Sequence, residues 1–349
     1  MQLSRLHLHQ FRSHTDREFQ FDSRLTAMIG PNGSGKTNIL EAIYTLCNGK
    51  SFRGGDDELI SYTQDWYRIE GEIDGVPREL RYQPSNKGKQ LLVDGTVKGR
   101  FTYRQQLPVV LFEPDDLLMI HASPSARRKY IDELLQKTHP AYRQIFSRYE
   151  RVVAQRNNLL KQHYAPSPAL TDNIFVWDVS LSELGASIVA GRIQLLEEIN
   201  SIISETYSEV AGKEQVVLLS YQSDTENSHE ASSLTTALSR NLAHDVRRGF
   251  TTVGPHRDDI EFSLNIQSAK HSASRGEVRS IVLSLKLIEI LLIHKSTDVL
   301  PLLLLDDVFS ELDETRQESV LQNGRVQTIL TTTGLLPAHA SQAHVINLG

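Results

Sequence analysis

A glycine-rich segment between a predicted strand and a predicted helix constrains this chain more than any other part of it. The segment follows the pattern G-x-x-x-x-G-K-[ST], and its residues are Gly30, Pro31, Asn32, Gly33, Ser34, Gly35, Lys36 and Thr37. The apolar run 25–29 before it is typical of a buried strand, and residues 38–48 have helical spacing. Glycines let backbone N–H groups turn toward phosphate oxygens, and the start of a helix adds partial positive charge. The glycine loop, residues 30–37, therefore predicts an α/β fold that binds phosphate.

Two side chains at the end of the glycine loop have specific expected roles. Lys36 is expected to reach the β- and γ-phosphates of a nucleotide, and the Thr37 hydroxyl is expected to ligate Mg²⁺. The alternative is a structural turn in which the lysine is coincidental. The flanking strand and helix favour the nucleotide, because the phosphate-binding geometry requires both.

A second chemical signal stands near the other end of the chain, where four leucines at 302–305 precede Asp306 and Asp307. Such a run is typical of a buried strand that ends in two acids. Beside a phosphate-binding loop, Asp306 is expected to share Mg²⁺ with Thr37, and Asp307 is expected to orient or deprotonate water. The alternative is a strand followed by a helix-capping aspartate. The predicted catalytic residues are therefore Asp307 and Lys36.

The separation of these two signals predicts an insertion. Lys36 and Asp306 are 270 positions apart, which is too far for one compact α/β unit. Between them, apolar residues recur at helical intervals, and a pair of long antiparallel helices is expected around Pro166 and Pro168, the second from about 173 to 210. The predicted domains are residues 1–122, the first half of an ATPase lobe; residues 123–250, an inserted and mainly helical lobe; and residues 251–349, the second half of the ATPase lobe.

Composition excludes several classes of protein. The net charge of −6 excludes a histone-like basic protein, and a single cysteine, Cys47, excludes a disulfide framework or a cysteine-based zinc site. The longest apolar stretches, 281–285 and 299–305, are shorter than the roughly 20 residues that a membrane-spanning helix needs. We therefore expect a soluble, cytoplasmic protein without a membrane partner.

A second anion-binding helix start is predicted at residues 274–276. Ser274 and Gly276 open a long predicted helix, and the helix dipole favours an anion there. The glycine loop already supplies this chain's own phosphate site. The second site is therefore expected to serve a nucleotide that is held by another copy of the chain.

The order of these features resembles the ABC-type head ATPases, which include SMC-like DNA-repair proteins. Further segments along essentially the full length resemble the RecF family of bacterial recombination mediators: 11–13, 38–43, 49–53, 108–114, 127–128, 254–259 and 305–313. The Gly-Pro-His-Arg-Asp-Asp segment at 254–259 is the most family-specific of them. The implied fold is an α/β P-loop ABC-type ATPase head, a mixed sheet flanked by helices, with an inserted helical lobe.

The resemblance also implies roles for individual residues. Residues from Asn32 to Asn38 would hold the ATP phosphates, and Arg12 and Arg53 would flank the nucleotide. Ser274 and Gly276 would contact the γ-phosphate across a dimer interface. Residues 310–313 resemble the segment that lies along that interface.

The function implied by the resemblance is an ATP-dependent homodimer that binds DNA. ATP would close the dimer on duplex or gapped DNA near junctions of single and double strands, without sequence specificity, and slow hydrolysis would release it. The implied partners are RecR and, as a second candidate, RecO, and the implied task is to load RecA at gaps. The alternatives are another SMC-like or ABC-like ATPase, a transporter motor, or an ATP sensor without a loading role.

Three positions depart from the usual ABC pattern. Glu277 stands where the signature helix usually has glutamine, and its negative charge is expected to weaken ATP-driven pairing. Asp307 replaces a longer glutamate, so slow hydrolysis is expected. Three threonines, 331–333, follow the last predicted strand where transporters have a histidine, and threonine cannot shuttle a proton near neutral pH.

Basic residues of the inserted lobe are candidates for DNA contact, with solvated helix faces as an equally favoured alternative. These residues are Arg127, Arg128, Lys129, Arg143, Arg148, Arg151, Arg156, Lys161, Arg247 and Arg248. Residues 256–259 are predicted to form a structural ion-pair corner rather than a metal site.

Overall fold

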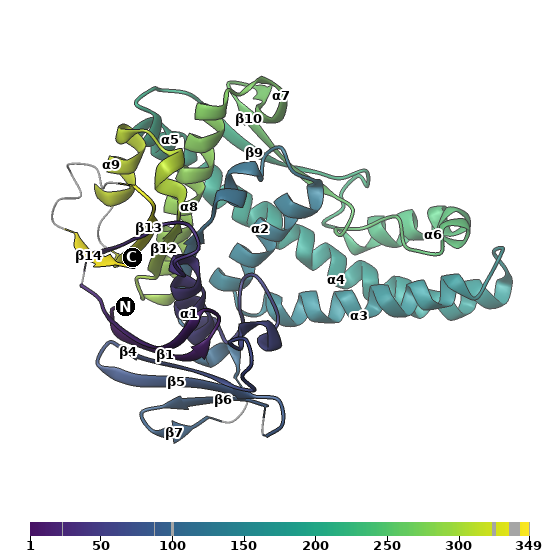
Figure 1. The fold of residues 1–349 in the computed structure, drawn as a ribbon. Helices are drawn as coiled ribbons and strands as arrows, with labels where there is room; N and C mark the ends of the chain where they lie inside the picture. Colours follow the sequence, from purple (N-terminus) through teal and green to yellow (C-terminus); the bar gives the residue numbers. More distant parts are fainter. Residues whose placement is uncertain (23, 87, 99–100, 323–325, 335–342, 349) are drawn as a thin grey trace. The chain divides into compact units, whose positions relative to one another are not determined.

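The computed structural model describes residues 1–349 except 23, 87, 99–100, 323–325, 335–342 and 349. The chain forms two compact units (Figure 1). The first unit contains Met1–Leu117, Glu209–Gly212 and Glu289–Gly349, and the second contains Leu118–Ser208 and Lys213–Ile288. The three-domain division stays a prediction, because compactness alone does not show that a segment folds independently.

The first unit contains an antiparallel sheet in the order β2-β1-β4-β5-β6-β7. Its strands are β1 (Leu3–Phe11), β2 (His14–Gln20), β4 (Tyr67–Ile73), β5 (Val76–Gln83), β6 (Gly88–Val93) and β7 (Thr96–Val97). Buried and half-buried residues alternate strictly along β4, which gives this part of the sheet one apolar and one polar face. The turn between β6 and β7 has positive φ at Asp94 and Gly95, as the Asp-Gly hairpin signal predicts.

A second sheet in the first unit has the order β14-β3-β13-β12-β8, and every neighbouring pair in it is parallel. Its strands are β3 (Leu25–Ile29), β8 (Val109–Phe112), β12 (Leu302–Asp306), β13 (Thr328–Thr332) and β14 (His344–Asn347). All five residues of β12 are buried, as expected for a strand that is covered on both faces. Strands from opposite ends of the chain are therefore hydrogen-bonded neighbours.

Helix α1 (Lys36–Asn48) connects the two sheets of the first unit. It contacts β1, β4 and β5 of the antiparallel sheet and β8, β12 and β13 of the parallel sheet (Figure 1). Its buried apolar side chains join one core with residues of both sheets. The helix ends at Gly49, whose φ of +74° lets its N–H bond to the Thr45 carbonyl.

Shorter elements complete the first unit. They are η1 (Asp56–Leu59), η2 (Tyr103–Gln105), η4 (Val308–Glu311) and α9 (Glu314–Gln322). Three further elements have residues in both units, namely η3 (Pro114–Leu118), α5 (Ile203–Ala211) and α8 (Arg275–Thr297).

The second unit is built from long helices and a small sheet. Its helices are α2 (Pro124–Thr138), α3 (Tyr142–Lys161), α4 (Pro168–Asn200), α6 (Ala231–Arg248) and α7 (Ala269–Ser272). Its sheet has the order β11-β10-β9, with β9 (Val217–Gln222), β10 (Asp259–Leu264) and β11 (Gln267–Ser268). Helix α4 packs against both α3 and α6.

Helix α4 also shows two differences from the sequence expectations. Pro168 begins the helix, and the Ser167 side chain caps it by accepting a hydrogen bond from the Leu170 N–H. The helix is 33 residues long with a mean hydropathy of 1.4 in one 18-residue window, so it could cross a membrane by length and composition alone. Half of that window is buried inside the protein, and a core helix passes the same test.

Candidate nucleotide-binding site

The glycine loop joins β3 to α1 in the first unit, and its backbone conformation depends on glycine. Gly33 and Gly35 have φ values of +83° and +92°. A Cβ atom at Gly35 would lie 2.7 Å from His14 Nε2, so no larger residue fits there without displacing the histidine. His14 is buried and its Nε2 lies 3.2 Å from the Gly35 carbonyl oxygen, while burial lowers the pKa of His14. His14 therefore packs against Gly35 and helps to hold the glycine loop in place, a role that the sequence did not suggest.

The Lys36 ammonium lies within the glycine loop. Its Nζ donates hydrogen bonds to the carbonyl oxygens of Gly30 at 2.6 Å and Pro31 at 2.9 Å. The side chain is buried, and it lines a cavity of about 270 Å³. A charged group that is held here by two backbone carbonyls is positioned to meet phosphate oxygens at the same loop.

Thr37 and Asp306 meet although they are distant in the sequence. The Thr37 hydroxyl donates to Asp306 Oδ1 at 2.9 Å. Thr331 donates its hydroxyl to the same Oδ1 at 2.8 Å and accepts the Asp307 N–H at 2.9 Å. Hydroxyl and carboxylate oxygens are the hard ligands that Mg²⁺ prefers, so the chemistry of this pair fits Mg²⁺. Thr331 was not predicted to position the acids.

The threonines of this region also correct a sequence expectation. Thr331 and Thr332 do not follow the last predicted strand, because both lie inside β13, and a further strand, β14, comes after it. Because Thr331 lies beside Asp306 in the register of β12 and β13, its hydroxyl points to the acids.

Asp307 follows β12 and lines the same cavity as the glycine loop. Its φ is +51°, a conformation that is uncommon for a residue with a side chain. The other residues around the cavity are Asn32, Gly33, Gly35, Lys36, Thr37, Asn38 and Arg53. The cavity is smaller than a typical site for a whole ligand of drug size, and its polar lining suits phosphate groups.

Arg12 and Arg53 converge on one buried carboxylate, that of Glu41. Arg12 donates to both carboxylate oxygens at 2.9 and 2.8 Å, and Arg53 Nη2 donates to Oε2 at 2.8 Å. The Ser51 hydroxyl adds a hydrogen bond at 2.6 Å. Burial raises the pKa of Glu41, but these hydrogen bonds outweigh burial and leave the pKa below its ordinary value. Glu41 thus orders both arginines, a role that its helical sequence pattern did not predict.

Asn38 connects this cluster to the turn between β1 and β2. Its Oδ1 accepts a hydrogen bond from Arg53 at 2.8 Å, and its Nδ2 donates to Ser13 Oγ at 2.9 Å. Of the residues predicted around the nucleotide, the structure gathers Arg53, Asn38, Lys36 and Thr37 at one cavity. Arg12 lies one contact away, through Glu41.

Ser274 and Gly276 belong to the second unit, at the start of α8. The Ser274 backbone N–H and hydroxyl both donate to Glu277 Oε2, at 2.8 and 2.7 Å, and the Glu277 N–H returns a bond to Ser274 Oγ at 3.3 Å. This is a capping box. Hydrogen bonds from Ser274 lower the pKa of Glu277, so its carboxylate is charged at neutral pH. For residues 310–313, the side chains of Ser310 and Glu311 lie outside the described part of the chain.

The basic residues of the second unit that were predicted to contact DNA fall into three groups by their exposure. Arg127 and Arg156 are buried and cannot contact DNA in this conformation: Arg127 binds both oxygens of Asp259, and Arg156 bonds to Asp178 and Asp245 at 2.6 Å each. Arg128 and Arg143 are half-buried, and the predicted residues that are exposed are Lys129, Arg148, Arg151, Lys161, Arg247 and Arg248.

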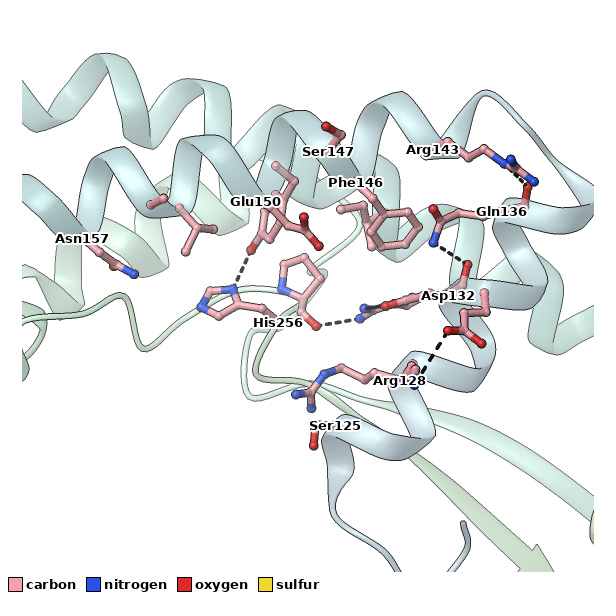
Figure 2. Close-up of a pocket in the computed structure, with 18 residues that line it drawn as sticks. Ser125, Arg128, Asp132, Gln136, Arg143, Phe146, Ser147, Glu150, Asn157 and His256 are labelled. Carbon is pink, nitrogen blue, oxygen red and sulfur yellow. Dashed lines mark hydrogen bonds and ion pairs between the residues drawn. The ribbon is translucent and has the colours of Figure 1, made fainter. Parts of the chain in front are cut away.

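Pro255 and His256 of the segment at 254–259 line a cavity of about 620 Å³ in the second unit (Figure 2). The Tyr149 hydroxyl lies 2.7 Å from His256 Nδ1, and Arg192 Nη1 donates to the Pro255 carbonyl at 2.7 Å. Arg192 is itself buried and paired with Asp132 at 2.7 Å. Hydrogen bonds therefore fix most of the segment. Asp259 adds an ion pair with Arg127, whereas Arg257 donates to the Thr251 carbonyl.

The chain is similar to known proteins over nearly its whole length. Residues 5–243 match the family described as AAA domain. A DNA replication and repair protein RecF from Lactobacillus johnsonii is 35% identical over 96% of this chain and 93% of its own length, and one from Lactobacillus acidophilus is 36% identical over the same shares.

Solved structures agree with these sequence matches. A structure of the recombination mediator protein RecF with ATPrS in the RecFOR pathway has a TM-score of 0.84 and 28% identity, and covers 95% of this chain and 92% of its own. An Smc head bound to the C-winged helix domain of ScpA has a TM-score of 0.53 and 16% identity, covers 96% of this chain and 90% of its own, and shows the fold alone. The chain therefore belongs to the RecF family of DNA replication and repair proteins and has the fold of an ABC-type ATPase head.

Proposed function

We propose that this chain is an ATP-dependent DNA-binding protein of replication and repair, which binds ATP with Mg²⁺ at the glycine loop. The observation that carries the proposal is the 2.9 Å hydrogen bond from Thr37 to Asp306, which joins a loop threonine to a strand-end carboxylate 269 residues later. A hydroxyl and a carboxylate that meet beside a phosphate-binding loop suit a Mg²⁺ ion shared with the phosphates. The relatives solved with ATP and ATPrS support the choice of nucleotide.

In this proposal each residue of the site has a defined task. The glycine loop and Asn38 hold the phosphates, and Lys36 neutralises charge on the β- and γ-phosphates. Thr37 and Asp306 would hold Mg²⁺, which supplies charge stabilisation during phosphoryl transfer. Asp307 orients or deprotonates the attacking water, and Arg53 and Arg12 flank the nucleotide.

Pairing of two copies would use the start of α8. Ser274 and Gly276 would contact the γ-phosphate of a nucleotide bound to the other copy, so ATP closes a homodimer and slow hydrolysis opens it. The glycine loop lies in the first unit and the start of α8 lies in the second. This separation supports different roles for them: the glycine loop would bind ATP, and the start of α8 would contact the ATP of the other copy.

DNA binding would use the exposed basic residues of the second unit. Contacts to the phosphate backbone give affinity without sequence specificity and make binding sensitive to salt. We further infer that the DNA would be duplex or gapped and that RecR, and secondarily RecO, would be partners. The task would be to load RecA, and the location would be the cytoplasm. The solved relatives described as belonging to the RecFOR pathway support this inference.

The experiment that tests the pairing is sedimentation velocity with ATP and Mg²⁺. Ser274→Arg places a bulky cation at the start of α8 and is expected to abolish the ATP-dependent dimer. Ser187→Arg is the matched control, because Ser187 is an exposed serine of α4 in the same unit. The proposal is wrong if Ser274→Arg dimerises as the wild type does.

A second candidate function is an ATP sensor that hardly hydrolyses ATP. It is favoured by Glu277, whose charge stands at the predicted γ-phosphate contact, and by Asp307, whose side chain is shorter than glutamate. ATP-driven pairing without measurable phosphate release, with or without DNA, would favour the sensor over the ATPase.

A further inference from the structure

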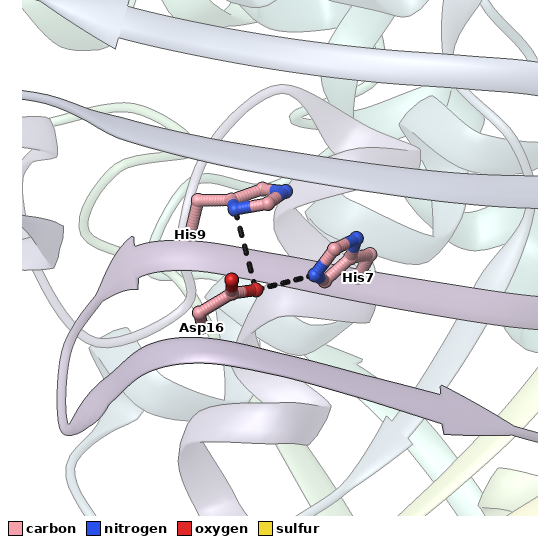
Figure 3. Close-up of side chains that lie close together, drawn as sticks. All are labelled: His7, His9 and Asp16. Atoms are coloured by element: carbon pink, nitrogen blue, oxygen red, sulfur yellow. Dashed lines mark hydrogen bonds and ion pairs between the residues drawn. The ribbon is translucent and has the colours of Figure 1, made fainter.

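Two histidines and one carboxylate meet on the polar face of the antiparallel sheet in the first unit (Figure 3), and a second carboxylate, that of Glu70, lies near both rings. His7 and His9 are two residues apart on β1, so their side chains share one face. In the strand register Asp16 of β2 is opposite His9, and Glu70 of β4 is opposite His7. This cluster lies outside the residues of the nucleotide site.

Asp16 faces one nitrogen of each imidazole. Its Oδ1 lies 2.5 Å from His7 Nε2 and 3.5 Å from His9 Nδ1. All three ligand atoms lie within 4.8 Å of one another. A tetrahedral ion with bonds of about 2.0 to 2.1 Å spaces its ligand atoms about 3.3 Å apart. The distance of 3.5 Å between Asp16 Oδ1 and His9 Nδ1 fits this spacing. The distance of 2.5 Å to His7 Nε2 is too short, but the Asp16 side chain is 69% exposed and can rotate to lengthen it.

Glu70 faces the opposite nitrogen of each ring. Its Oε2 lies 3.6 Å from His7 Nδ1 and 3.7 Å from His9 Nε2. Histidines that bind metals usually present their second ring nitrogen to a carboxylate, which fixes the ring and its tautomer. The cluster therefore has an inner carboxylate toward which both rings converge and an outer carboxylate behind both rings.

We propose that His7 Nε2, His9 Nδ1 and Asp16 bind a zinc-class divalent transition-metal ion, with water in the fourth position and Glu70 as the outer carboxylate. Two imidazoles and one carboxylate select zinc over Mg²⁺, which prefers oxygen ligands. This site does not depend on the function proposed above.

Arg68 competes with the metal. Its Nη2 lies 3.0 Å from His9 Nε2, and since arginine can only donate, this contact keeps Nε2 unprotonated and places the ring proton on Nδ1. For the metal to bind at Nδ1, the neutral ring must first move its proton from Nδ1 to Nε2 by exchange with water. The Nε2–H would then donate toward Glu70, and Arg68 would move away. Arg68 is half-buried and already contacts Glu70 at 3.2 Å, so it has a second partner.

The position of the site links it to the glycine loop. His9 and Asp16 face each other across the hairpin of β1 and β2, whose turn carries Arg12 and Ser13 and whose second strand begins at His14. These three residues contact Glu41, Asn38 and Gly35 respectively. A metal ion at the base of the hairpin would stiffen the turn that supports the nucleotide site.

The test is a zinc titration of the full chain after chelator treatment, in the presence of excess Mg²⁺ to occupy oxygen-only sites. Zinc affinity is measured by competition with a chromophoric chelator, and Co²⁺ absorption reports the coordination geometry. We expect one tight equivalent in wild type, at least tenfold weaker binding in His9→Gln and Asp16→Asn, and tighter binding in Arg68→Gln.

His229→Gln, at an exposed histidine of the second unit, is the control and is expected to bind zinc as wild type does. Thermal unfolding without zinc checks that each variant is folded, and a zinc-dependent rise in melting temperature is expected only where the site is intact. Equal zinc affinity in wild type, His9→Gln and Asp16→Asn would overturn the proposal, as would weaker binding in Arg68→Gln.

Discussion

The carboxylate of Glu41 accepts hydrogen bonds from Nε and Nη2 of Arg12, at 2.9 and 2.8 Å. Arg53 bonds to the same carboxylate, so one buried acid on α1 orders two arginines beside the nucleotide cavity. Removing the acid leaves both cations without their principal partner, and the consequences can be measured.

Glu41→Gln is expected to lower the free energy of unfolding by about 3 kcal/mol, because it breaks a largely buried ion pair. Weaker ATP binding is also expected, since Arg53 loses its orientation. Urea denaturation and nucleotide titration measure the two effects. Glu79→Gln, which breaks the surface pair with Arg81, is the control and should cost under about 1 kcal/mol. Equal losses in both variants would contradict this account.

Thr331→Val removes one hydroxyl and keeps the shape of the side chain. Since that hydroxyl bonds to Asp306 Oδ1 and to the Asp307 N–H, we expect roughly 10- to 100-fold weaker apparent Mg²⁺ affinity. The measurement is the Mg²⁺ concentration that gives half-maximal ATP hydrolysis. Thr331→Ser should restore it, and Thr328→Val, in the same strand, should leave it unchanged. A normal Mg²⁺ dependence in Thr331→Val would show that the hydroxyl does not position the acid.

Asp307→Asn tests the hydrolytic carboxylate. Loss of a general base slows a reaction by about 100-fold or more, so phosphate release should fall by that factor with ATP binding retained. The rate is measured with and without gapped DNA, and Asp298→Asn serves as an exposed control. Wild-type rates in Asp307→Asn would remove this residue from catalysis.

Glu277→Gln separates charge from helix capping at the start of α8. Glutamine also completes a capping box, so the helix start should be kept while the negative charge is lost. Removing one like charge near a phosphate at the surface is worth about 1 kcal/mol, and the ATP-dependent dimer should tighten roughly fivefold. Sedimentation at several protein concentrations gives the dimer constant. An unchanged constant would mean that Glu277 does not oppose pairing.

His256 predicts a pH dependence of stability in the second unit. Burial lowers its pKa to about 4, and the nearby Arg257, Arg128 and Arg156 add to this, although the Thr251 carbonyl opposes it. The unfolded chain then binds the proton more readily than the folded chain, so stability is complete above pH of about 6.5 and is lost as the pH falls toward 4. The loss is on the order of 3 kcal/mol.

Urea denaturation of wild type and His256→Gln at several pH values between 4 and 7.5 measures this contribution. The variant should show a flatter pH dependence, whereas His229→Gln, at an exposed site, should follow wild type. Parallel curves for wild type and His256→Gln would show that the buried imidazole does not titrate in this range.

The parts of the site that follow a local pattern could be predicted from the sequence. The glycine loop follows a pattern of adjacent residues, and the four leucines before Asp306 are a short apolar run bounded by turn signals, which is typical of a buried strand. Those elements, together with the family resemblance, predicted the fold class, which the comparisons confirm.

The parts that depend on tertiary contacts could not be predicted in this way. Glu41 lies in an ordinary helical pattern, and only the folded chain places Arg12 and Arg53 beside it. Arg156 looked like a basic residue on a helix surface, but two aspartates from distant segments bury it. Strand β14 has only four residues, three of which are exposed, so its pairing with β3 was missed.

The parallel pairing of β3 with β13 and β14 has a consequence for synthesis of the protein. A ribosome completes the glycine loop long before it reaches Asp306, and at about 5 to 20 residues per second the delay is roughly 15 to 50 s. During that interval β3 lacks both of its hydrogen-bonded neighbours, while the long helices between them can already pair. The nucleotide site is therefore among the last parts of the protein to be assembled.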